Sequence, residues 1–131
     1  MPQKSDSIRQ TRPEPRIRSA AVKKTRNKLA GSLDSIQSEL QKAELWENTS
    51  PPPHHLQSTE PFCVDTLDFS QWLQWVFIPK MRFILDQEAP LPPASSIHIL
   101  AQEALKDMDQ DMSRLIAAIR RFDRLLSGDD A

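Results

Sequence analysis

Four residues with reactive or metal-binding side chains stand close together near the middle of this 131-residue chain: His54, His55, Cys63 and Asp65. A cysteine thiol beside a histidine can serve as a nucleophile with its general base. The spacing orders no such pair, and a lone cysteine among apolar neighbours usually behaves as a small hydrophobic side chain. We therefore interpret Cys63 as a half-buried structural thiol.

The same four side chains are also a conceivable metal-binding set, because imidazole, thiolate and carboxylate groups all bind zinc. Their spacing matches neither a zinc finger nor a zinc ribbon, and the run Pro51-Pro52-Pro53 restricts how they could converge. The chain contains two glycines and no nucleophile-elbow motif, so a glycine-rich phosphate loop is not expected either. We predict no metal, no cofactor, no catalytic residue and no enzymatic activity.

Polar residues on both sides of an aromatic segment form a better candidate site. Their side chains could line a groove and receive a small ligand or a peptide. For Asp65 and Thr66 we favour the alternative that they cap the following helix and fasten the preceding loop. An exposed Trp75 would mark a protein interface, whereas a complete helical bundle would bury it. The candidate binding residues are Asp65, Thr66, Gln74, Trp75, Pro79 and Lys80.

The segment at residues 68–85 is the element that must position these side chains. At 3.6 residues per turn it is apolar nearly all round, which is typical of a helix that needs partners on most sides. Asp68 and Gln71 have the spacing of a capping box. Pro79 removes one hydrogen bond of the helix, which predicts a kink or a break after Ile78. One face is predicted to hold Phe69, Trp72, Leu73, Val76, Phe83 and Ile84, with Trp75, Ile78 and Leu85 on the other side.

Three further segments have helical periodicity, at about residues 19–46, 96–107 and 110–127. In the first of them, apolar residues recur at spacings of three, four and seven, and Arg26 interrupts this seam near its start. Together with the segment at 68–85, they predict an all-α four-helix bundle whose long first connection is rich in proline. The predicted core consists of Leu33, Ile36, Leu40, Phe62, Phe69, Trp72, Leu73, Val76, Ile84, Leu115, Ile119 and Phe122.

The net charge of -1 conceals a strong asymmetry along the chain. Residues 1–28 contain nine Lys or Arg and two acidic residues, so they carry about +7, while the remainder carries about -8. We interpret residues 1–18 as a basic disordered tail ahead of a single domain at residues 19–128. An alternative is that residues 1–28 contact an anionic partner such as RNA. The single cysteine and the absence of any signal-peptide core or bilayer-spanning stretch predict a cytoplasmic protein without membrane contact.

Several motifs resemble the bacterial YqcC-like family. They are Trp46, then Pro61-Phe62-Cys63-Val64-Asp65-Thr66-Leu67, then Gln71-Trp72-Leu73-Gln74-Trp75-Val76-Phe77-Ile78-Pro79-Lys80-Met81, then Leu91-Pro92. The resemblance extends from about Leu29 to Leu126 and leaves out the basic N-terminal extension. It implies a small four-helix bundle without an established activity, so no catalytic residue can be carried over. Some members of the family stand beside a tRNA pseudouridine synthase or are joined to one, which implies an association with RNA modification.

From the residues and the resemblance together, we expect an uncharacterised YqcC-like domain that acts as a non-enzymatic protein-interaction module. Its partner is predicted to be another protein, held at an apolar patch around Trp75, Phe77 and the bend at Pro79. Two alternatives stay open. One is an accessory RNA-binding protein linked to tRNA pseudouridine modification, and the other is a small-ligand pocket near Asp65 and Gln74.

Overall fold

The computed structural model describes the backbone of residues 16–128 and the side chains of residues 22–128. The described part is helical and contains no strand, so the all-α prediction is confirmed. The short α2, the π-helical turn η3 and α3 follow one another without a gap and form one helical rod. The elements are α1 (Arg16–Lys42), η1 (Pro53–Gln57), η2 (Pro61–Cys63), α2 (Phe69–Trp72), η3 (Leu73–Phe77), α3 (Ile78–Asp86), α4 (Ile97–Leu105) and α5 (Ser113–Leu126).

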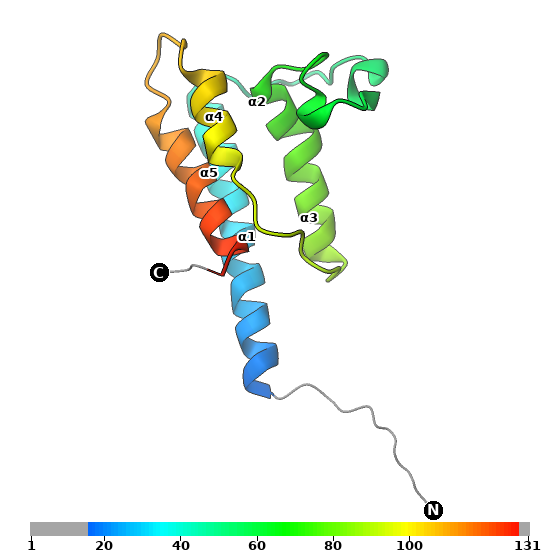
Figure 1. Cartoon of the computed structure of the whole chain (residues 1–131), viewed down its shortest axis with the longest axis vertical. Coiled ribbons are helices and arrows are strands. Elements are labelled where there is room, and N and C mark those ends of the chain that lie inside the picture. Colours follow the sequence, from blue (N-terminus) through cyan, green and yellow to red (C-terminus); the bar gives the residue numbers. More distant parts are fainter. Residues whose placement is uncertain (1–15, 129–131) are drawn as a thin grey trace, which may run out of the picture.

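The long helix α1 is the central element of the bundle. It packs against α5 on one side and against α3 on the other, while α4 packs on α5 (Figure 1). Helix α4 also meets the rod at α2 but stands apart from α3, and the connection between α3 and α4 joins their lower ends in Figure 1. The first turns of α1 extend beyond the other helices.

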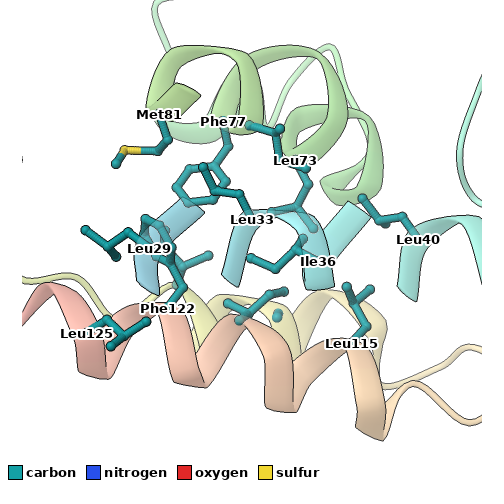
Figure 2. Close-up of a cluster of buried hydrophobic side chains, with 14 of the residues drawn as sticks. Leu29, Leu33, Ile36, Leu40, Leu73, Phe77, Met81, Leu115, Phe122 and Leu125 are labelled. Carbon is teal, nitrogen blue, oxygen red and sulfur yellow. The ribbon is translucent and has the colours of Figure 1, made fainter. Parts of the chain in front are cut away.

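The core is built on the apolar seam of α1. Its leucines and isoleucine are fully buried, as the spacing of fours and threes predicts (Figure 2). Apolar side chains of α5 meet this seam from one side, and those of η3 and α3 meet it from the other. A T-shaped contact between Phe77 and Phe122, with ring centroids 5.0 Å apart, joins the two flanks. The seam residues are Leu29, Leu33, Ile36 and Leu40.

The helix boundaries differ from the predicted ones. Helix α1 begins at Arg16, so the predicted tail 1–18 is helical from that residue onward, and residues 1–15 lie outside the described residues. The same helix ends at Lys42, four residues before the predicted end. There Glu44 adopts φ 62°, the Leu45 amide donates to the Leu40 carbonyl at 2.9 Å, and the Glu44 amide donates to the carbonyl of Gln41. This is a Schellman motif, which stops a helix by satisfying its last carbonyls.

The inward face of the second helical rod was predicted incorrectly. In the π-helical turn η3 the Ile78 amide donates to the carbonyl of Leu73, five residues back, so the turn holds one residue more than an α-turn. The extra residue rotates the following helix, which buries Phe77, Ile78 and Met81. Of the residues predicted to share that face, Leu73 is buried as predicted. Phe69, Trp72, Val76 and Ile84 are half-buried, and Phe83 is exposed.

Pro79 does not break the helix after Ile78. It is exposed near the start of α3, directly after the wider turn. Because proline has no amide hydrogen and its ring crowds the preceding turn, the π-helical turn accommodates it without interrupting the rod.

The unfavourable backbone of Glu44 leads to a stability prediction. We expect Glu44→Gly to raise the free energy of unfolding by about 1 kcal/mol, because glycine adopts positive φ without a steric penalty. Urea denaturation monitored by circular dichroism measures the change. The control is Glu44→Ala, which removes the same charge but keeps a Cβ atom. An equal gain for both variants would show that the charge, and not the backbone, is responsible.

Candidate functional site

Two of the predicted binding residues hold the segment that follows α1. The Gln74 side chain is buried, and its amide grips the backbone of Glu47 at two points. Its Oε1 accepts from the Glu47 amide at 2.8 Å, and its Nε2 donates to the Glu47 carbonyl at 2.6 Å. The indole Nε1 of Trp75 donates to the Glu47 carboxylate at 3.2 Å, and the ring is half-buried. Both side chains are therefore engaged within the fold.

Asp65 and Thr66 fasten the proline-rich connection, as one half of the favoured interpretation predicted, but they do not cap the following helix, whose N-cap is Asp68. The Thr66 hydroxyl donates to the carbonyl of His55 at 2.7 Å, and the Ser58 hydroxyl donates to the Asp65 carboxylate at 2.5 Å. The capping box is also present, with the Asp68 amide donating to Oε1 of Gln71 at 2.8 Å. The polar groups of Asp65, Thr66 and Gln74 that were expected to meet a ligand are thus engaged in hydrogen bonds within the fold.

The structure does not gather His54, His55, Cys63 and Asp65, the set considered for metal binding, into one site. Among residues 22–128, no three His, Cys, Asp or Glu side chains lie close enough together to hold a metal ion. The Cys63 thiol is buried. None of the described helices combines the length and the apolar character needed to cross a bilayer.

An apolar groove of about 1090 Å³ lies between α3 and α4 and is called here the α3–α4 groove. One wall comes from the rod α2–η3–α3 and the other from α4, so the groove opens between the two helices that stand apart in Figure 1. The exposed side chains of Lys80 and Glu103 stand on opposite lips. The lining residues are Pro61, Phe62, Trp72, Val76, Phe77, Lys80, Met81, Ile84, Pro92, Pro93, Ser95, Ser96, Ile97, Ile99, Leu100, Glu103 and Leu126.

An aromatic pair forms one end of the groove. Phe62 was predicted to belong to the core, yet its side chain is 41% exposed. Its backbone adopts φ 59°, and that of Cys63 adopts φ 50°, conformations that cost about 1–3 kcal/mol each for residues other than glycine. They present the ring of Phe62 edge-on to Trp72, with the centroids 4.9 Å apart. Trp72 in turn stacks on Phe77 at 5.2 Å, so the end of the groove is tied to the core.

A buried carboxylate fixes the opposite wall. Asp123 of α5 is 4% exposed and accepts hydrogen bonds from two residues at the start of α4. Its Oδ2 accepts from the His98 amide at 2.9 Å and lies 2.6 Å from the His98 ring Nδ1, while its Oδ1 accepts from the Ser95 hydroxyl at 2.6 Å. The carboxylate thus caps the first turn of α4 from a neighbouring helix, where the helix dipole favours a negative charge.

Of the six candidate binding residues, Lys80 alone lines the α3–α4 groove. The patch predicted around Trp75, Phe77 and Pro79 is only partly exposed, since Phe77 lies in the core, Trp75 is half-buried and Pro79 is exposed. Sequence reasoning missed Ile99, which is 57% exposed. The available signal was the run Ile97-His98-Ile99-Leu100-Ala101, which contains more apolar side chains than one core-facing stripe needs.

Comparison with known proteins found a matching family model and several similar proteins. A family model, DUF446, described as "tRNA pseudouridine synthase C", matches residues 28–125. An uncharacterized protein YqcC of Escherichia coli K12 is 32% identical over 105 residues, which cover 80% of this chain and 96% of that protein. An uncharacterized protein of Haemophilus influenzae is 30% identical over 105 residues, which cover 98% of its length.

Two further matches concern an enzyme and a solved structure. A protein of Pectobacterium carotovorum named tRNA pseudouridine synthase C is 41% identical over 66 residues, which are 50% of this chain and 18% of that one. The solution NMR structure of YqcC from Escherichia coli superposes with a TM-score of 0.70 at 33% identity, covering 82% of this chain and 92% of that chain.

The three donors around Asp123 lead to a prediction about the wall of the groove. We expect Asp123→Ala to lower the free energy of unfolding by about 2–3 kcal/mol, because it leaves the His98 amide and the Ser95 hydroxyl without their acceptor. Hydrogen exchange should show the first amides of α4 losing protection before those of α1. Asp86→Ala, at an exposed position, is the control and should change stability by no more than about 0.5 kcal/mol. Equal effects of the two substitutions would contradict the capping role.

Proposed function

This chain belongs to the YqcC-like family, and we propose that it is a non-enzymatic module that binds another protein through the α3–α4 groove. The observation that carries the proposal is the amount of apolar side chain left outside the core along this groove. Ile99, Phe62 and Val76 line it while remaining exposed or half-buried. Contiguous apolar surface with a polar rim is typical of interaction sites, and Lys80 and Glu103 supply that rim.

The polar groups near the groove support binding rather than catalysis. A serine nucleophile needs a base within hydrogen-bond reach. The Ser95 hydroxyl instead donates to the Asp123 carboxylate, which also accepts from His98. Serine and histidine are therefore both bonded to the carboxylate and not to one another, an arrangement that caps a helix and does not activate a hydroxyl. Lys80 and Glu103 stand on opposite lips and are not paired as acid and base.

The partner that we propose is a tRNA pseudouridine synthase. In the Pectobacterium protein of that name, the matched stretch is 18% of the chain, so a related sequence is covalently continuous with the rest of that protein. Covalent linkage makes an association between two parts intramolecular and raises their effective concentration. Where the related sequence is a separate chain, as in the Escherichia coli and Haemophilus influenzae proteins that match over 96% and 98% of their length, a binding surface of its own would be needed for the same association.

Direct binding to the synthase tests this proposal. We expect the purified protein to bind the tRNA pseudouridine synthase C of its own source organism in isothermal titration calorimetry. Ile99→Asp should weaken the affinity by about 30-fold or more, because it places an unpaired charge in a desolvated apolar contact. Phe83→Asp is the matched control, since Phe83 is 63% exposed and lies outside the groove.

The control should bind like the wild type, with both variants checked for unchanged thermal unfolding. Lack of binding by the wild type would reject the synthase as the partner. Equal affinity for Ile99→Asp and Phe83→Asp would reject the groove as the site.

A second candidate function is RNA binding through residues 1–28, supported by the shape of α1. Its first turns project beyond the bundle, and Lys23 and Lys24 are exposed there. The family model begins at residue 28, so this basic stretch is an addition to the part that the family shares. A basic segment that projects into solvent can approach nucleic-acid phosphates without interference from the acidic body.

Titration of tRNA at several salt concentrations tests this second function. We expect the double substitution Lys23→Glu and Lys24→Glu to weaken binding roughly tenfold or more near 0.1 M salt. The salt slope should fall by about 1–2, because each lysine that neutralises a phosphate contributes about one unit to it. Asp34→Asn, on the folded part of α1, is a control that should bind tRNA as tightly as the wild type. An affinity that is insensitive to salt and to the double substitution would rule out the basic stretch.

A further inference from the structure

The α3–α4 groove has the form of a vacant helix position, and we propose that its occupant is an amphipathic α-helix of about three turns contributed by the partner protein. The inference rests on the proposed function, because it names the kind of segment that the groove receives. The occupant would lie along α3 and α4 and complete the bundle on its open side (Figure 1).

The first argument is the way the walls are built. On the rod α2–η3–α3 the lining residues Trp72, Val76, Lys80 and Ile84 recur every four positions. They span about 18 Å at 1.5 Å per residue, the length of a helix of three to four turns. On α4 the lining residues Leu100 and Glu103 continue the same kind of stripe. Two such ridges with a trough between them fit a third helix, whose side chains pack into the grooves of both.

The second argument concerns hydrogen bonding by the occupant. Main-chain amides and carbonyls that are buried need partners. An extended segment obtains them by pairing with a sheet edge, but the described part of this chain contains no strand. A helix satisfies its main-chain groups internally, so it can be buried against apolar walls without help from them. The lining of this groove is therefore compatible with a helix and unfavourable for a strand.

The third argument comes from the two ends of the groove and from the charges on its two lips. The lining includes Phe62 and Trp72 from the α2 end of the rod and Pro92 and Pro93 from the connection that leads into α4, and its length along the rod fits an occupant of about three turns. Lys80 on one lip and Glu103 on the other favour an acidic flank toward α3 and a basic flank toward α4. Turning the occupant end for end exchanges its flanks, so the two charges select one direction. The Glu103 carboxylate also lies 2.6 Å from Nζ of Lys106, so Lys80 is the cleaner charge to test.

Peptide probes test the occupant even while the partner's own segment is unidentified. The probe is a labelled synthetic peptide of about twelve residues, with leucines at positions i, i+4, i+7 and i+11, glutamates on one flank and lysines on the other. Fluorescence anisotropy should show saturable binding to the full chain. The same peptide with one central residue replaced by proline should bind roughly 100-fold more weakly, because the proline disrupts the helix. Binding should be lost with Ile99→Asp and retained with Phe83→Asp.

Charge reversal tests the lips of the groove. Lys80→Glu should bind the helical peptide roughly threefold to tenfold more weakly than the wild type, because both lips are then acidic and the glutamate flank meets one of them in either direction. Equal binding of the helical and proline peptides, no binding of any peptide, or indifference to Ile99→Asp would each overturn the inference. Competition separates this result from the proposed function. If the synthase binds at the groove and the helical peptide does not displace it, the proposal of a helical occupant is rejected and the proposed binding function is kept. If the peptide binds at the groove and the synthase does not bind, the proposal of the synthase as partner is rejected and the helical occupant is kept.

Discussion

One buried seam on one helix has to serve two sides of the bundle. Leu29, Leu33, Ile36 and Leu40 of α1 face α5 on one flank and the rod η3–α3 on the other. Each flank buries its own apolar stripe against α1, and the two flanks also touch where Phe77 meets Phe122. Helix α3 packs mainly on α1 and helix α4 mainly on α5, while α4 meets the rod at α2. The apolar groove between them is a consequence of this division.

Several polar side chains of the domain hydrogen-bond to the backbone of the connections and so hold it against the helices. Gln74 pairs with both main-chain groups of Glu47, Thr66 pairs with the carbonyl of His55, and Asp123 pairs with the start of α4. Main-chain groups outside helices must find partners, and long connections need several such fixings to stay folded against a small core. Side chains that resemble ligand-binding groups in the sequence are consumed in this way.

Much of the fold could be read from local sequence because its signals are local. The seam of α1 and the capping box of Asp68 follow from helical periodicity and from contacts within one turn. The inward face of the second rod could not be read, because the π-helical turn at Leu73–Phe77 inserts one residue that periodicity does not reveal. The exposure of Phe62 depends on a positive φ, which could not be predicted because no glycine or asparagine stands at Phe62 or Cys63. The groove depends on the distance between α3 and α4, which the sequence does not specify. The only sign of it in the sequence is the excess of apolar residues in α4.

The position of α5 in the sequence, far from α1, has a consequence for how the domain folds during synthesis. The seam of α1 lies at the start of the chain, and its principal cover, α5, is the last helix, roughly eighty residues later. During synthesis at about 5–20 residues per second, the nascent seam would wait on the order of ten seconds for that cover. Contacts so distant in sequence also slow folding of the completed chain, because a long loop must close before they form. The arrangement therefore makes the emergence of α5 the step that commits the nascent chain to its native core.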